Sequence, residues 1–191
     1  MERQKVVFFT GAGISVDSGI PTFQEQPGIR DKLTRDFANT HPEEYREAIK
    51  AMMESCEKAE PNAAHIAIAK TGFPVITMNV DRLHNKAGSK TVIEVHGKLP
   101  TREEVEKKDF PLTYDGIILY GDLAPEYVTA TKLVKSLEYA NSFFVIVGTS
   151  FYTGISEQLK RIATQRRAKV IIINEKASER VPEICKRLIT R

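Results

Sequence analysis

Near its start the chain reads Val6-Val7-Phe8-Phe9-Thr10-Gly11-Ala12-Gly13-Ile14-Ser15. A short apolar run that ends in glycines is typical of a strand buried on both faces of a parallel sheet. Glycine at positions 11 and 13 lets the backbone turn sharply and approach a ligand where a Cβ would clash. Backbone N–H groups in such a turn, followed by a helix start, form an anion site. The stretch therefore predicts a turn that binds the pyrophosphate of a dinucleotide.

This glycine pair does not complete the standard dinucleotide fingerprint. That motif has a third glycine three residues after the second, where this chain has Val16. It also has a second strand that ends in an acidic residue roughly 20 positions later. Residues 24–36 are instead polar and are interrupted by Pro27-Gly28. On this motif alone, a glycine turn that only packs a strand against a helix is the alternative.

Further motifs follow in a fixed order and extend the comparison over nearly the whole chain. Residues 11–23, from the glycine turn to Phe23, resemble the first signature of the sirtuins, which are NAD-consuming protein deacylases. The other segments that resemble sirtuin motifs are 59–65, 77–88, 92–97, 148–150 and 171–174. The resemblance implies an α/β fold with a doubly wound parallel sheet, Rossmann-like as in the sirtuin large domain. It also implies an NAD-dependent protein-lysine deacylase (deacetylase) that releases nicotinamide and O-acyl-ADP-ribose.

Size and composition predict one domain over residues 1–191. The resemblance implies that it is a single sirtuin-like NAD-binding catalytic domain. The net charge of +3 is small and spread out, so no nucleic-acid partner is expected. No apolar run reaches the roughly 18 residues that cross a bilayer, so no membrane partner is expected. The charged residues 1–5 do not resemble a secretory signal, which favours a cytoplasmic location.

The segment 98–115 marks the largest departure from the family. A typical sirtuin carries a small zinc module with two Cys-x-x-Cys pairs after its catalytic histidine, whereas 98–115 contains no cysteine or histidine. Two cysteines in the whole chain cannot form a four-thiolate zinc site. We therefore expect no zinc, a small zinc domain that is absent or vestigial, and a short linker over 98–115. Residues 24–60 are expected to form a loop and helical subdomain on the cofactor side.

Apolar segments that alternate with helical patterns predict the sheet. Six strands are expected, over 6–9, 74–77, 91–95, 116–120, 143–147 and 170–173. Helices are expected over 15–20, after a capping box at Thr40-His-Pro-Glu43, and over 61–70, 81–86, 126–139 and 181–189. Each polar motif follows the C-terminal end of a strand, where open parallel sheets bind ligands. We therefore expect the motifs to meet in one crevice.

His96 follows the strand expected over 91–95. A histidine with an unperturbed pKa near 6.5 can accept a proton at neutral pH, as a general base must. The resemblance implies that His96 deprotonates a hydroxyl of the nicotinamide ribose after the acyl oxygen has attacked C1′. The alternative is a histidine that only caps the end of a strand.

Asn79 and Asp81 form the second predicted catalytic group, which also binds the cofactor. The resemblance implies that the asparagine orients ribose or water and that the aspartate accepts a hydrogen bond from the nicotinamide amide, which suits a carboxylate. The alternative is a turn in which both side chains bond their own backbone. His65 and His84 are expected to be structural.

The remaining predicted NAD contacts also rest on the resemblance. They are Gly11, Ala12, Gly13, Ser15, Phe23, Gln24, Gly148, Thr149, Ser150 and Asn174. The hydroxyl side chains are expected to donate to phosphate or ribose oxygens, beside the backbone N–H groups of Ala12 and Gly148. Asn174 is expected to hold the adenine-side ribose, and Phe23 to cover the nicotinamide pocket.

The acylated lysine of a protein or peptide is the expected second substrate. Tyr120, Gly121 and Asp122 resemble the family's Phe-Gly-Glu substrate segment. Other positions differ from the family: Gln24 replaces an arginine and Met78 replaces a glutamine. An NAD glycohydrolase or ADP-ribosyltransferase on the same scaffold, and a non-catalytic module that binds NAD or ADP-ribose, are therefore alternative functions.

Overall fold

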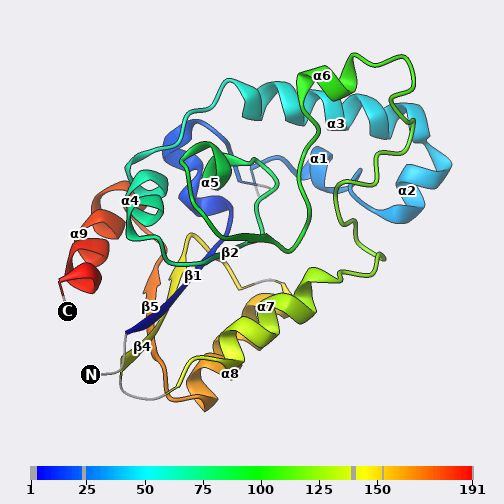
Figure 1. Cartoon of the computed structure of the whole chain (residues 1–191). Helices are drawn as coiled ribbons and strands as arrows, with labels where there is room; N and C mark the ends of the chain where they lie inside the picture. Colours follow the sequence, from blue (N-terminus) through cyan, green and yellow to red (C-terminus); the bar gives the residue numbers. More distant parts are fainter. Residues whose placement is uncertain (1–3, 23–24, 139–140, 152, 191) are drawn as a thin grey trace.

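The computed structural model describes residues 4–22, 25–138, 141–151 and 153–190. Its centre is a five-stranded parallel sheet with the strand order β3-β2-β1-β4-β5 (Figure 1). The strands are β1 (Lys5–Thr10), β2 (Val75–Thr77), β3 (Val92–Glu94), β4 (Ser142–Val147) and β5 (Lys169–Ile173). The chain crosses from β3 to β4 on the far side of β1, so the predicted doubly wound, Rossmann-like fold is confirmed.

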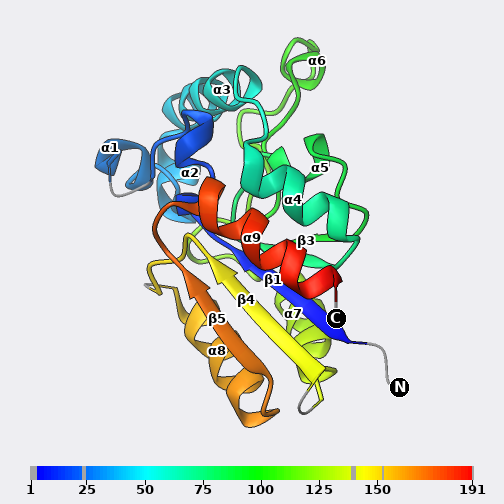
Figure 2. The ribbon, with the colours of Figure 1, turned by 90° about the vertical axis from the view of Figure 1, so that its left-hand side faces the viewer.

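Helices cover both faces of this sheet, which explains why its central strands are apolar on both sides. On one face, α4 (Ala63–Thr71) and α9 (Ala177–Ile189) pack over Val6 and Phe8. On the other, α7 (Glu126–Lys135) and α8 (Gly154–Gln165) pack over Val7 and Phe9. Figure 2 shows the two helix layers on opposite sides of the strands.

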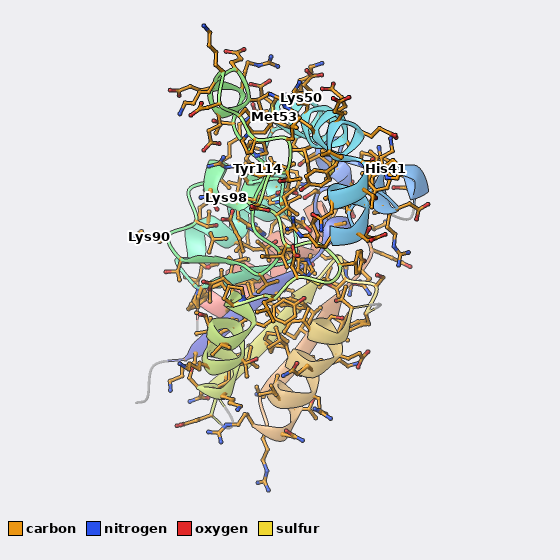
Figure 3. The ribbon with its side chains drawn as sticks, turned by 90° about the vertical axis from the view of Figure 1, so that its right-hand side faces the viewer. His41, Lys50, Met53, Lys90, Lys98 and Tyr114 are labelled. Carbon is orange, nitrogen blue, oxygen red and sulfur yellow. The ribbon has the colours of Figure 1, made fainter. Side chains whose placement is uncertain are left out.

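A further unit, here called the outer wall, consists of residues 25–57 and 98–122. It contains α1 (Pro27–Arg30), α2 (Arg35–Thr40), α3 (Pro42–Glu57) and α6 (Arg102–Val105). Its own core joins Tyr45, Ile49 and Met52 of α3 to Leu99 and Phe110. Residues 98–115, predicted to be a linker, therefore pack against α3. In Figure 3, Lys98 and Tyr114 lie side by side beneath this helix, and the Tyr114 hydroxyl donates to the Lys98 carbonyl at 3.1 Å.

The prediction of a sheet strand over 116–120 is wrong, because this segment forms no strand of the sheet. Ile118 N–H donates to the His96 carbonyl at 2.9 Å and Tyr120 N–H to the Leu33 carbonyl at 3.1 Å, so this segment joins β3's exit to the outer wall. Its apolar residues Ile117 and Leu119 are buried in the core of the outer wall. An apolar run predicts burial but does not identify the core in which the residues are buried.

Two helix predictions also need correction. Residues 15–20 do not form one brief helix, because two 3₁₀ turns, η1 (Ala12–Ile14) and η2 (Val16–Ser18), occupy this region. The capping box at Thr40 is absent, since His41 precedes α3 without a side-chain cap and the Thr40 hydroxyl donates to the Asp36 carbonyl. A capping box forms instead from Thr101 and Glu104 at the start of α6.

The remaining helix, α5 (Leu83–Lys86), follows the exit of β2. Its preceding residue, Arg82, has a left-handed backbone with φ of 63°. Among the described residues, no helix combines the length and apolar character needed to cross a bilayer.

Candidate active site at the carboxyl edge of the sheet

A cavity of about 680 Å³ lies where the strands end and the outer wall begins. This volume is within the range of about 300–1,000 Å³ typical of small-molecule sites. Residues from the strand exits line one side, namely Ala12, Gly13, Met78, Asn79, His96, Gly148, Thr149, Ser150 and Asn174. Leu33, Met52 and the segment 117–122 of the outer wall line the other side. The expected convergence on one crevice is therefore seen for these residues.

The glycines of the first turn are required by packing inside the protein. A Cβ on Gly13 would lie 2.7 Å from the Gly148 Cα atom, and one on Gly11 would lie 2.7 Å from the Gly148 carbonyl oxygen. Gly148 itself has φ of 62°, and its Cβ would lie 2.3 Å from the Ile14 nitrogen. The turn after β1 therefore rests directly on the exit of β4, which brings two predicted cofactor motifs together.

Several amides of this turn already have partners. Gly11 N–H donates to the Val147 carbonyl and Gly13 N–H to the Gly148 carbonyl, both at 3.0 Å. Gly148 N–H donates to the Ile173 carbonyl at 2.9 Å. The phosphate donor role predicted for the Gly148 amide is therefore not supported by this structure.

Ser15, Asn79 and Asp81 form a buried hydrogen-bonded network. The Ser15 hydroxyl donates to Asp81 Oδ2 at 2.6 Å, and Asn79 Nδ2 donates to Ser15 Oγ at 3.0 Å and to Asp81 Oδ2 at 3.2 Å. Leu83 N–H donates to Asp81 Oδ1 at 2.9 Å. Ser15 uses its only proton on Asp81, so its predicted donation to the cofactor is not available in this arrangement. Of the three residues in this network, Asn79 is the one that lines the cavity.

The His96 ring is held at both nitrogens. Nδ1 lies 3.2 Å from the Met78 carbonyl oxygen, and Nε2 lies 2.8 Å from the Tyr127 hydroxyl. A carbonyl only accepts, so these contacts assign the proton of the neutral ring to Nδ1. Burial lowers the pKa of His96 below its usual value, although the hydrogen bond to Met78 acts in the opposite direction. At pH 7 the ring is therefore neutral, as a general base must be.

The exits of β4 and β5 are joined through Asn174. Its Oδ1 accepts from Thr149 N–H and its Nδ2 donates to the Thr149 carbonyl, both at 3.0 Å. These bonds fix the loop that carries Thr149 and Ser150 beside the cavity. Asn174 also lines the cavity, so its predicted place at the cofactor end of the site is consistent with the structure.

The Asp122 carboxylate is used within the protein. Arg35 holds it bidentately, with Nε–Oδ1 and Nη2–Oδ2 distances of 2.8 Å, and Leu119 N–H donates to Oδ2 at 2.9 Å. The hydrogen bonds from Arg35 lower the pKa of Asp122. Asp122 lines the cavity together with Tyr120 and Gly121, so its substrate contact stays a prediction, and its bonds to Arg35 and Leu119 hold this segment in place.

A model of the Sir2 family matches residues 11–111 of this chain. The chain belongs to the Sir2 family. The relatives of this Sir2-family protein include a Thermotoga maritima NAD-dependent protein deacetylase, which is 34% identical over 91% of this chain and 82% of its own length. An Aquifex aeolicus NAD-dependent protein deacylase is 32% identical over 91% of this chain and 84% of its length.

Solved Sir2 structures share this fold along nearly the whole chain. A mutant Sir2 homologue with ADP-ribose superposes with a TM-score of 0.86 at 25% identity, covering 97% of this chain and 92% of its own. A Sir2 homologue in complex with NAD superposes with a TM-score of 0.83 at 25% identity, covering 97% of this chain and 90% of its own. A Sir2 protein in complex with 2′-O-acetyl-ADP-ribose and a deacetylated p53 peptide superposes with a TM-score of 0.77 at 27% identity. This match covers 97% of this chain and 93% of its own. The resemblance inferred from the motifs is confirmed.

Some residues that line the cavity lie outside every motif identified in the sequence. Tyr127 contacts His96 from α7, and Met52 reaches the cavity from α3. Both lie in ordinary helical patterns, so the sequence offers no signal that would separate them from core residues. Phe23 and Gln24, predicted to bind the cofactor, lie outside the described residues. Within the described part of the chain, no group of three His, Cys, Asp or Glu side chains is arranged to hold a metal ion.

His65 and His84 lie together in the interior, as expected of structural residues. Their ring centroids are 4.9 Å apart, and His84 Nε2 lies 3.0 Å from the Thr10 hydroxyl. Burial lowers the pKa of His65 to about 4 and that of His84 to about 3. Both rings are therefore neutral at pH 7 and fill the space beneath the exits of β1 and β2.

Proposed function

We propose that this protein is an NAD-dependent protein-lysine deacylase of the sirtuin type, which releases nicotinamide and O-acyl-ADP-ribose. The observation that carries the proposal is the neutral His96, which shares one cavity with the glycine turn and Asn79. The relatives named as NAD-dependent protein deacetylases support this reaction and a protein substrate.

The residues at the strand exits are suitable for NAD. When bound, NAD supplies the glycosidic bond to nicotinamide and the ADP-ribose that takes the acyl group. We assign Ala12, Gly13, Thr149, Ser150 and Asn174 to its phosphate and adenosine side, because they line the cavity at the glycine turn and at the exits of β4 and β5. Asn79 and His96 would contact the nicotinamide ribose.

His96 then acts as the general base. Its Nε2 takes the proton of a ribose hydroxyl, and the Met78 carbonyl stabilises the resulting imidazolium through Nδ1–H. Asn79 is held by Ser15 and Asp81, so its amide is oriented before a ligand binds. Asp81 acts through this network in the present arrangement, and its predicted bond to the nicotinamide amide remains a proposal.

The outer wall is suited to the acyl chain. Leu33, Met52 and Leu119 are apolar residues of the outer wall that line the cavity beside the polar side chains of Arg30 and Tyr120, which gives a surface that can receive the acyl chain of a lysine. We therefore infer acylated lysine in a protein as the second substrate.

One assay tests the function. Nicotinamide release from NAD is measured with and without an acetyl-lysine peptide, for the native chain, His96→Ala and the control His41→Ala, whose imidazole is exposed near α3. We expect peptide-dependent release that falls about 10²–10⁴-fold in His96→Ala, the usual contribution of a general base. Release without peptide would favour the glycohydrolase, and NAD binding without release would favour the binding module.

The cellular context stays a prediction. We propose a cytoplasmic location without a nucleic-acid or membrane partner, on the basis of the net charge of +3 and the absence of a long apolar run. Fractionation of the producing cells, with the protein found in the soluble fraction and unaffected by nuclease, is the expected result. Recovery with the membrane fraction would contradict it.

A further inference from the structure

The acceptor nitrogen of His96 is already occupied in this structure. A neutral imidazole has one N–H and one lone pair, and Nδ1–H is directed to the Met78 carbonyl. The Tyr127 hydroxyl, 2.8 Å from Nε2, must therefore donate to the lone pair. The nitrogen that has to accept the substrate proton is bound by a side chain of the protein.

This contact is built into the fold. Tyr127 lies in the first turn of α7, 31 residues after His96, and α7 is anchored to the sheet through the fully buried Ala130 and Val134. The Tyr127 ring is tilted by 46° against the imidazole, with centroids 5.9 Å apart, and packs against the same core cluster. Desolvation raises the pKa of Tyr127, so its oxygen keeps the proton that it donates.

The geometry limits what a ligand can do. The single lone pair of an sp² nitrogen accepts one well-directed hydrogen bond, so a sugar hydroxyl cannot reach Nε2 while Tyr127 holds it. Both rings line the cavity, so the Tyr127 hydroxyl and a ligand hydroxyl compete for the same nitrogen from the same space. His96 can act as a base only after the ligand hydroxyl has replaced the Tyr127 hydroxyl at Nε2.

We propose that Tyr127 is a positioning residue for His96, which holds Nε2 until a ribose hydroxyl of NAD replaces the phenol. The inference rests on the proposed function in one respect, namely that NAD is the ligand. In the later step the ribose O–H bond breaks and the Nε2–H bond forms, while Tyr127 keeps its own proton throughout. A proton relay through the phenol is the competing scheme.

The exchange has a measurable consequence for binding. A ligand that must displace an internal hydrogen bond binds more weakly by the net free energy of that bond, which corresponds to about two- to tenfold in affinity. Removing the hydroxyl removes this competition. Tyr127→Phe should therefore bind NAD about two- to tenfold more tightly.

The experiment combines calorimetric titration with NAD, steady-state kinetics and ¹⁵N NMR of labelled His96, for the native chain, Tyr127→Phe and Tyr114→Phe. Tyr114 is the matched control because its hydroxyl likewise donates to an acceptor within the protein, the Lys98 carbonyl, whereas Tyr114 does not line the cavity. In the native chain, NAD should move the Nε2 resonance, and in free Tyr127→Phe that resonance should already differ from native. Tyr114→Phe should match native in all three measurements.

The outcomes separate the schemes. Tighter binding with an altered Nε2 resonance supports the proposal. Unchanged NAD affinity or an unchanged Nε2 resonance in Tyr127→Phe would overturn it, and so would a loss of kcat greater than tenfold, which marks a relay. The NMR and binding readouts do not depend on deacylation, so they remain decisive even if the His96→Ala assay rejects the proposed reaction.

Discussion

The sheet edge and the outer wall enclose the same cavity but are held in different ways. At the sheet edge, parallel pairing aligns the last residues of neighbouring strands, with Thr10 opposite Thr77 and Val147 opposite Ile173. The outer wall has no strand in this sheet and depends on its own apolar core. The proposed catalytic residues are therefore placed by strand pairing, and the surface proposed for the acyl group is placed by a separate apolar core.

The sheet edge should tolerate the least change. Gly148→Ala would place a Cβ against the backbone of Gly13 and Ile14 at a left-handed φ of 62°. Because the obstacles are backbone atoms, we expect a loss of more than about 3 kcal/mol in unfolding free energy, measured by urea denaturation. Gly28→Ala in α1 of the outer wall, where a Cβ meets nothing within 4 Å, is the matched control. Equal stability of the two variants would remove the distinction between the regions.

The histidine pair beneath the sheet edge should make stability depend on pH. The pKa of His65 is lowered to about 4 from 6.5, so the unfolded chain binds more protons between these values and stability falls as the pH falls through this window. The loss approaches about 1.4 kcal/mol per pH unit for each such histidine. In denaturation series from pH 7 to 4, His65→Leu should have a shallower slope than native, whereas the exposed-site control His41→Gln should keep it. An unchanged slope in His65→Leu contradicts the assignment.

A smaller effect is expected where the outer wall meets the cavity. Arg35→Lys replaces a bidentate contact with Asp122 by a single one, so we expect a loss of about 1 kcal/mol in stability. The peptide KM should rise because the segment 119–122 loses its anchor, while the Kd for NAD stays constant. Arg102→Lys, which alters the exposed pair with Glu57, should change neither constant. A weakened NAD affinity in Arg35→Lys would show that the two regions are not separable.

The sequence predicted the sheet edge far better than the outer wall. Apolar runs that end in polar motifs, such as those before Gly11 and Gly148, identify strands and their exits because both signals are local. The run 116–120 carries the same apolar signal but is buried in the other core, a choice set by tertiary packing. The partner of His96 could not be predicted either, since Tyr127 reaches it from a helix whose pattern reports only burial. For Ser15 and Asp122, the motif placed both residues near the predicted site. Their hydrogen-bond partners, Asp81 and Arg35, could not be read from the sequence.

The most direct test follows the acyl group. The native chain is incubated with NAD and an acetyl-lysine peptide, and the products are quantified by mass spectrometry. We expect nicotinamide, deacetylated peptide and O-acetyl-ADP-ribose in equal amounts. Nicotinamide with free ADP-ribose and an unchanged acetylated peptide would contradict it.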